Sequence, residues 1–246
     1  MRDSRAAADR LRREAGLPQD SPAAPERVLP RLYPVASILL PDLCVSVLRE
    51  WLERHGANAP SLVRCRDRRL RGAVVAWKGC GLLCADAGDG DLQRRFTLAH
   101  EAGHFLQDHY YPRQDLLNRF GPGIQSVLDG LRPPTVEERV DALLGRASFA
   151  LYTHLFDRDD ELAWGSGAVQ AAEEGADEFA CEMLAPRAAL RLRCPDLRAD
   201  EDSATRVRGV LVHEFGLPPG PALRCARRFV ARHGSPVTVL HRIGLA

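Results

Sequence analysis

The 246-residue sequence lacks the features that mark several broad classes of protein. Its formal net charge is only +1, so it carries no overall positive charge suited to nucleic acid or to an acidic membrane surface. Its most apolar run, residues 33–48, is interrupted by Pro41 and Asp42 and is too short to span a bilayer. The first residues lead into an Arg/Ala-rich stretch without the apolar segment of a secretory signal. We therefore expect a cytoplasmic protein with no membrane segment.

Cysteines are present, but in no pattern typical of a disulfide framework. There are seven, an odd number, and none forms a C-x-x-C pair. Cys80 and Cys84 come closest to a metal-binding pair; we interpret them as packing within a strand and keep metal binding as the alternative. The cysteines therefore predict free thiols in a reducing compartment.

Histidine is also scarce, with 8 in the chain, yet two of them lie four residues apart in His100-Glu101-Ala102-Gly103-His104. On an α-helix, histidines at this spacing project from one face and can bind a single Zn²⁺. Glu101 lies about 100° around the helix from His100, which suits a base that takes a proton from metal-bound water. The motif is typical of a zinc hydrolase. The alternative is a surface helix that carries two histidines by coincidence.

The neighbours of this motif predict that its helix is buried on one side. Gly103 lowers helix propensity by about 1 kcal/mol relative to alanine, so we expect another backbone to approach closely there, where a second ligand helix crosses. The apolar residues that recur at helical spacing are Phe96, Ala99, Ala102, Gly103 and Leu106.

A third metal ligand does not follow directly after the motif. The continuation H-x-x-G-x-x-H of one class of zinc peptidases is excluded, because Gln107 and Tyr110 occupy the required positions. Asp108 lies about 6 Å further along the helix axis than His104 and is a weaker alternative. We therefore expect the third ligand on a later helix.

The helix predicted over residues 168–184 offers Glu173 and Asp177, both on or beside its apolar face. Buried carboxylates need a cation or hydrogen-bond donors. We predict that Glu173 is the third ligand and that Asp177 accepts the free N–H of a ligating histidine; pairing of both with arginines is the alternative. The apolar face also carries Ala176, Ala180 and Leu184, whereas Glu174, Glu178 and Glu182 form a face that we expect to be solvated.

Two sequence blocks together resemble the ImmA/IrrE family of bacterial and phage metallopeptidases. The first reads Arg95-Phe96-Thr97-Leu98-Ala99-His100-Glu101-x-Gly103-His104, and the second reads Glu173-x-x-Ala176-Asp177-x-Phe179-Ala180-x-Glu182-Met183-Leu184-Ala185-Pro186. By this resemblance the metal ligands are His100, His104 and Glu173, and Glu101 is the general base. The spacing between the blocks is longer than expected for the family, and Ala102 and Ala185 replace bulkier residues.

The resemblance implies a fold and an activity. The implied fold is α+β, a minimal zincin-like (gluzincin-like) unit in which a small sheet packs on the metal helices. The implied activity is intracellular, site-specific cleavage of a helix-turn-helix transcriptional repressor. Zn²⁺ is the expected cofactor, with Mn²⁺ as the alternative because two histidines and a glutamate can bind either ion.

The rest of the sequence predicts the organisation around this unit. We expect an N-terminal helix and linker over 1–25, the metallopeptidase domain over 26–190 and a helical C-terminal region over 191–246. Two strands joined by a glycine turn are expected within 70–86, and their exposed edge could bind an extended peptide by adding a strand; a hairpin that merely covers the core is the alternative.

A helical insertion over about 110–165 is predicted within that domain. Thr135-x-x-Glu138 has the capping-box pattern and opens an amphipathic helix that we extend to Leu151. Tyr111, Tyr152 and His154 are possible donors to an oxyanion, but we interpret each as structural.

Three functional hypotheses follow. The first is a zinc metalloendopeptidase, and the second is a non-proteolytic, metal-dependent binding or sensor module that acts on a transcription regulator. The third is direct DNA binding through a helix pair around Gly216-Leu217-Pro218, and we favour a solvated basic face over it. The basic residues concerned are Arg224, Arg227, Arg228 and Arg232.

Overall fold

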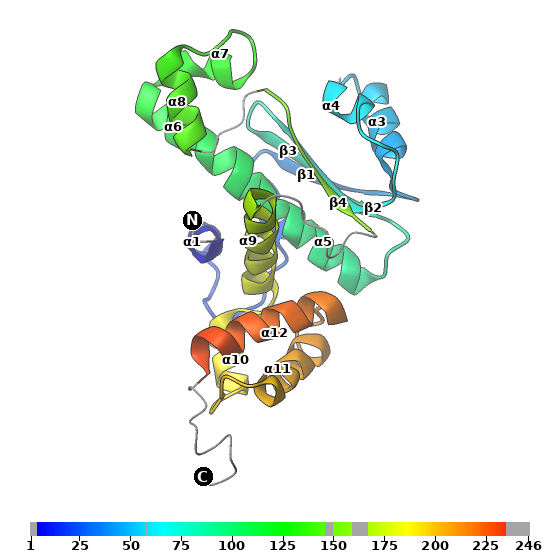
Figure 1. Ribbon diagram of the computed structural model, residues 1–246, viewed down its shortest axis with the longest axis vertical. Coiled ribbons are helices and arrows are strands. Elements are labelled where there is room, and N and C mark those ends of the chain that lie inside the picture. Colours follow the sequence, from blue (N-terminus) through cyan, green and yellow to red (C-terminus); the bar gives the residue numbers. More distant parts are fainter. Residues whose placement is uncertain (1–3, 58, 146–149, 159–166, 235–246) are drawn as a thin grey trace.

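A four-stranded sheet and the helix that carries the His100 motif form the centre of the molecule (Figure 1). The computed structural model describes residues 4–57, 59–145, 150–158 and 167–234. The strand order is β1-β3-β2-β4, with β1 parallel to β3 and the other neighbours antiparallel. The α+β class is therefore confirmed. The strands are β1 (Val35–Leu40), β2 (Leu70–Trp77), β3 (Cys80–Asp86) and β4 (Tyr152–Asp157).

The predicted hairpin is present as β2 and β3. Its two-residue turn places Lys78 at φ 54° and Gly79 at φ 80°. Positive φ at both central residues defines the turn that best matches the twist of antiparallel strands. Pairing of Trp77 with Cys80 closes the hairpin directly beside this turn.

Strand β4 was not predicted, and it lies inside the segment expected to be a helical insertion. It pairs with β2 in the register Val74 to His154. The edge of β2 that we expected to be exposed is therefore covered by the chain itself. The amphipathic helix α8 ends at Gly145, and Leu151 lies outside it; Ala147, which we also placed in that helix, is outside the described residues.

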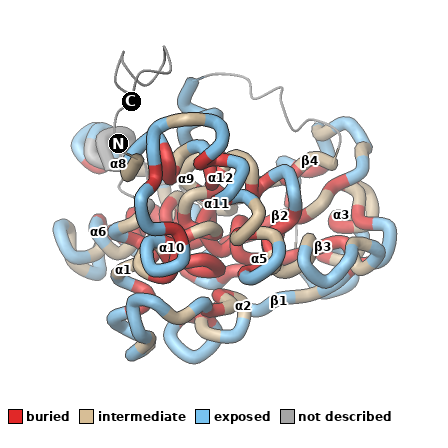
Figure 2. The backbone as a smooth tube through the Cα atoms, turned by 90° about the horizontal axis from the view of Figure 1, so that it is seen from below, coloured by how far each residue is buried: buried red, intermediate tan, exposed pale blue. Residues whose placement is uncertain are grey.

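The metal-motif helix α5 (Asp91–His104) packs against α9 (Gly167–Leu184) and runs on through a π-helical turn, η2 (Phe105–Tyr110). A Cβ at Gly103 would lie 3.0 Å from the Cα of Ala176 in α9. The predicted close approach of a second helix at Gly103 is confirmed. In Figure 2 buried residues run along α5 and the strands beneath the C-terminal helices.

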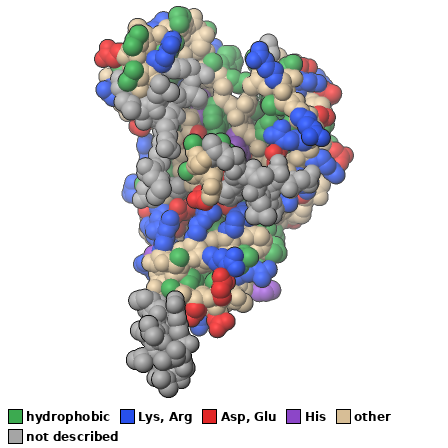
Figure 3. All heavy atoms as spheres, in the orientation of Figure 1, with side chains coloured by type: hydrophobic (Ala, Val, Ile, Leu, Met, Phe, Trp, Pro, Cys, Tyr) green, Lys and Arg blue, Asp and Glu red, His purple; other side chains and the backbone are tan. Residues whose placement is uncertain are grey.

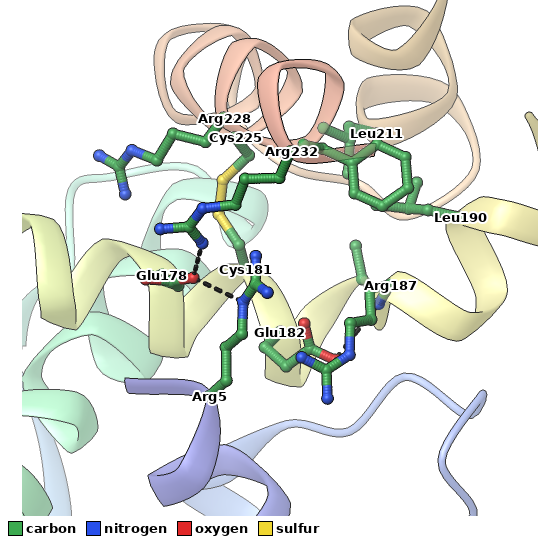
Figure 4. A pocket seen from close by; sticks show the side chains of 12 residues that line it. Arg5, Glu178, Cys181, Glu182, Arg187, Leu190, Leu211, Cys225, Arg228 and Arg232 are labelled. Carbon is green, nitrogen blue, oxygen red and sulfur yellow. Dashed lines mark hydrogen bonds and ion pairs between the residues drawn. A yellow bond between two sulfur atoms is a disulfide. The ribbon is translucent and has the colours of Figure 1, made fainter. Parts of the chain in front are cut away.

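The face of α9 that we expected to be solvated is covered at Glu178 and Glu182, whereas Glu174 keeps an exposed hydrogen bond with Gln170. Glu182 is only 8% exposed, and Glu178 forms ion pairs with Arg5 and Arg232 (Figure 4). The cause is that α1 (Ser4–Glu14) and α12 (Pro219–His233) pack on this side of α9, which a helical wheel of α9 alone does not reveal. In the view of Figure 3, which is that of Figure 1, basic side chains gather across the middle of the molecule.

The prediction of free thiols is wrong for two of the seven cysteines. Cys181 in α9 and Cys225 in α12 form a disulfide with a Cα–Cα distance of 6.5 Å (Figure 4). Their separation of 44 residues hides this pairing in the sequence, and only the packing of α12 on α9 brings them together. The remaining cysteines are free, namely Cys44, Cys65, Cys80, Cys84 and Cys194.

Shorter helices complete the molecule. Thr135 and Glu138 form the predicted capping box, in which each backbone N–H donates to the other residue's side chain. None of the described helices has the length and apolar character that a bilayer crossing requires. On the N-terminal side lie α2 (Pro25–Val28), η1 (Leu29–Arg31), α3 (Val45–Arg54) and α4 (Pro60–Val63). The insertion holds α6 (Tyr111–Phe120), η3 (Pro122–Ile124), α7 (Gln125–Leu128) and α8 (Val136–Gly145), and the C-terminal region holds α10 (Arg187–Arg193), α11 (Glu201–His213) and α12.

The crossing of α5 and α9 yields a stability prediction. Gly103→Ala should lower the free energy of unfolding by about 1–2 kcal/mol, because the clash with Ala176 outweighs the gain of about 1 kcal/mol in helix propensity. Gly209→Ala is the matched control. Gly209 also lies within a helix, but a Cβ there would meet no atom within 4 Å, so this change should stabilise the protein. Denaturant unfolding measures both, and equal effects would contradict the account.

Candidate metal site

The two motif histidines point their Nε2 atoms at each other from successive turns of α5. His100 Nε2 and His104 Nε2 are 3.2 Å apart, and both side chains are buried. Glu101 is fully buried beside them, with an exposed fraction of 0%. Residues four apart lie on one face of a helix, so local geometry alone brings the two imidazoles together.

Helix α9 supplies the carboxylate that the sequence predicted. Glu173 Oε2 lies 3.3 Å from His100 Nε2, and Glu173 Oε1 lies 3.6 Å from His104 Nε2. Because α9 crosses α5 at Gly103, Glu173 reaches both histidines. The structure therefore brings together the three residues that we predicted as metal ligands.

Two further carboxylates orient the histidines from behind. Asp177 Oδ1 lies 3.1 Å from His100 Nδ1, and Asp108 Oδ2 lies 2.8 Å from His104 Nδ1. Asp177 thus occupies the orienting position that we predicted for it. Asp108, which we considered as a weaker candidate ligand, lies on the Nδ1 side of His104 and has the same orienting role.

A fourth donor, His154, comes from β4, and from the sequence we interpreted this histidine as structural. His154 Nε2 lies 2.7 Å from Glu173 Oε1, and His154 Nδ1 lies 3.0 Å from Glu101 Oε2. Its ring stacks on that of His104, with centroids 3.7 Å apart. The available signal was the alternation of Tyr152, His154 and Phe156 with Thr153 and Leu155, which is typical of a strand with one face against the core.

The donor set fits a metal ion. Donor atoms of His100, His104, His154 and Glu173 all lie within 4.8 Å of one another, so this cluster could hold a metal ion. A carboxylate at Nδ1 fixes the proton there and turns the lone pair of Nε2 inward. Two lone pairs that face each other at 3.2 Å repel unless a proton or a metal ion lies between them.

Glu101 also belongs to this cluster, but only one of its two carboxylate oxygens has a hydrogen-bond partner among the described residues. Its Oε2 meets His154, whereas its buried Oε1 has no hydrogen-bond partner among the described residues. The sheet approaches at Gly72, where a Cβ would lie 3.2 Å from Glu101 Oε1. A buried carboxylate oxygen without a partner is costly and is typical of a site built for a ligand or for water.

Without a metal, the cluster holds protons. Burial lowers the pKa of His100, but hydrogen bonds to Asp177 and Glu173 outweigh it and raise the pKa to about 9. The pKa of His154 is raised to about 10, because its interactions with Glu101 and Glu173 outweigh its burial. The same hydrogen bonds hold the pKa of Glu173 well below its usual range despite burial. A metal ion must displace these protons, so its affinity rises with pH.

Two arginines of α12, Arg224 and Arg228, face this site. Arg224 Nε donates to Asp177 Oδ2 at 2.8 Å, and Arg228 lies 3.6 Å from the same oxygen. Arg232 pairs with Glu178, and Arg227 pairs with Glu201. The expected solvated basic face is therefore wrong for Arg224 and Arg228, which lie against Asp177. It holds for Arg227 and Arg232, whose side chains are 57% and 42% exposed.

The two tyrosines considered as oxyanion donors behave differently. Tyr152 donates from its hydroxyl to Asp108 Oδ2 at 3.3 Å, so it contacts the carboxylate that orients His104. The Tyr111 hydroxyl lies 3.1 Å from that of Tyr33 within the core, where no site residue meets it among the described contacts.

The orienting carboxylates yield a prediction for metal affinity. Asp177→Asn should weaken Zn²⁺ binding about 10–100-fold, because the amide no longer fixes the tautomer of His100 by accepting its Nδ1–H as a carboxylate does. Competition with a chromogenic chelator measures the affinity. Glu174→Gln, on the same helix but pointing to Gln170, should leave it unchanged. Equal affinities in all three proteins would contradict this role for Asp177.

His109 yields a prediction for pH-dependent stability. It is buried, and neither ring nitrogen has a partner among the described residues. Burial, with the nearby charge of Arg113, lowers its pKa from 6.5 to about 4. The unfolded chain therefore binds this proton at a higher pH than the native protein, and the free energy of unfolding falls as the pH drops through this window.

His109→Leu should reduce this fall in the free energy of unfolding by up to about 3 kcal/mol, because leucine binds no proton in either state. Unfolding curves of both proteins, measured between pH 6.5 and pH 4, give the difference. A parallel decline in the variant would show that His109 is not the responsible group.

Comparison with known proteins adds no assignment to this geometry. No family model, no curated protein and no solved structure matches the chain.

Proposed function

We propose that this protein is a zinc-dependent metalloendopeptidase built on a zincin-like unit. The observation that carries the proposal is the pair of inward-facing Nε2 atoms of His100 and His104, with the carboxylates of Glu173 and Glu101 beside them. Two histidines and a glutamate are a known ligand set of catalytic zinc, and the adjacent glutamate is the usual base.

The residues divide the chemistry between them. His100, His104 and Glu173 would hold the ion. A bound zinc ion lowers the pKa of a water molecule and polarises a peptide carbonyl. Glu101 would accept the proton from water and pass it to the leaving amine. Asp177 and Asp108 would keep both imidazoles in the tautomer that the ligands need.

The proposed substrate is a helix-turn-helix transcriptional repressor in the cytoplasm. This part rests on the resemblance of the blocks around His100 and Glu173 to ImmA/IrrE metallopeptidases. Zn²⁺ is the proposed ion, and Mn²⁺ is the alternative for the same donors.

One observation favours a second candidate function. Four protein donors, including His154, lie within reach of one ion, and closed four-ligand sites are typical of structural zinc. On this alternative the protein is a metal-dependent binding or sensor module that acts on a transcription regulator without cutting it.

Glu101→Gln separates the two candidates. The variant should keep its zinc, because Glu101 is not among the proposed ligands, and should lose at least about 100-fold in hydrolysis rate. Cleavage of a mixed peptide library, read by mass spectrometry at high enzyme concentration, measures the rate, and elemental analysis measures the zinc. Unchanged cleavage in the variant would refute the role of Glu101. Zinc without cleavage in every form of the protein would favour the binding module.

A further inference from the structure

Strand β4 covers the site along its whole length. Side chains at alternate positions of a strand share one face. Tyr152 contacts Asp108, His154 lies between Glu101 and Glu173, and Phe156 stacks on His100 with ring centroids 4.4 Å apart. Three successive residues on this face of β4 therefore each contact a different part of the cluster.

The opposite face of β4 has an ordinary structural role. Leu155 packs into the core formed by β2, α3 and α4, and the Thr153 hydroxyl lies 3.5 Å from that of Ser61. The contacts with the cluster are thus confined to one face of the strand, and they can be tested separately from the other face.

The site is closed while β4 is in place. Glu101 and His100 have exposed fractions of 0%, and the His154 side chain, at 14%, is the most exposed member of the cluster. A peptide carbonyl cannot reach the buried Nε2 atoms unless the residues above them move. Four protein donors would also leave no open position on an ion held there.

The strand occupies the place where a peptide would add to the sheet. β4 runs antiparallel to β2, and β2 lies against α5 at Gly72, beside Glu101. Addition of a strand to a sheet edge is a common way to bind an extended peptide. The edge of β2 nearest the metal motif is therefore filled by a segment of the same chain.

Ion pairs outside the cluster hold the end of β4. Arg158 donates to Asp86 and to Asp89, each at 2.7 Å, and Asp157 pairs with Arg68. Asp86 ends β3, and Asp89 lies in the loop before α5, so these pairs fasten β4 to the segment that leads into the metal helix. These ion pairs can be weakened without a change in any residue of the cluster.

We propose that β4 is an internal occupant of the substrate position and that His154, as a fourth ligand, keeps the metal site closed in the resting protein. This inference rests on the proposed peptidase function and adds its regulation. Displacement of β4 from β2 removes His154 and uncovers the position beside Glu101. The same geometry describes the substrate: an extended segment, antiparallel to β2, with aromatic or large apolar side chains where Tyr152 and Phe156 now lie.

Two variants open the site by different routes. His154→Ala removes the fourth donor. Arg158→Ala removes the ion pairs that hold the end of β4, at a distance from the cluster. Thr153→Ala is the matched control, because it lies on the same strand with its side chain on the other face. Each zinc-loaded protein is titrated with acetohydroxamic acid by calorimetry, its zinc is measured by elemental analysis, and its cleavage of the peptide library is timed.

The expected result is full zinc content in all four proteins. His154→Ala and Arg158→Ala should each bind acetohydroxamic acid at least tenfold more tightly than the unmodified protein and cleave the library at least tenfold faster. Thr153→Ala should match the unmodified protein. The faster cleavage should disappear when Glu101→Gln is added.

The other outcomes separate the two claims. Full zinc with hydroxamate affinity and cleavage unchanged or lowered in both opened variants overturns the closure by β4 and leaves the peptidase proposal standing; a loss of cleavage in His154→Ala alone would make His154 a catalytic group instead. Absence of zinc, or cleavage that survives Glu101→Gln, overturns the proposed function itself and the inference with it.

Discussion

The central constraint in this structure is the approach of two imidazole nitrogens, His100 Nε2 and His104 Nε2, to 3.2 Å in a buried site. Carboxylates behind both rings turn the lone pairs inward, so the pair is stable only with a positive charge between them. Much of the surrounding architecture serves this arrangement. Gly103 lets α9 cross closely enough for Glu173 to reach the histidines, and Gly72 lets the sheet lie against Glu101.

A second layer connects the site to the C-terminal helices. Arg224 and Arg228 of α12 meet Asp177, which in turn holds His100. The Cys181–Cys225 disulfide joins the same two helices one turn further along α9 (Figure 4). Residues of α5, α9 and α12 also share one apolar core. The C-terminal helices therefore position the ligand helix, and two of their arginines pair with its Asp177.

Local sequence patterns predicted the parts of the site that depend on helical spacing. His100, Glu101 and His104 follow from one turn of helix, and Glu173 and Asp177 follow from two carboxylates on an apolar face. The close approach at Gly103 also followed, since a glycine within a buried helix needs a packing reason. The hairpin of β2 and β3 followed from its glycine turn.

Patterns within one segment could not predict contacts between distant ones. β4 is a six-residue strand within a segment of mainly helical character, and its place on β2 depends on pairing some 80 residues away in sequence. His154 was therefore not assigned to the site. The burial of Glu182 and the disulfide depend likewise on α1 and α12 packing on α9, which the periodicity of α9 alone does not contain.

One measurement tests the central claim most directly, namely the metal content of the purified protein and of Glu173→Ala after exhaustive dialysis. We expect nearly one zinc ion per chain in the unmodified protein and loss of this zinc in the variant. No metal in either protein, or equal metal in both, would contradict this claim.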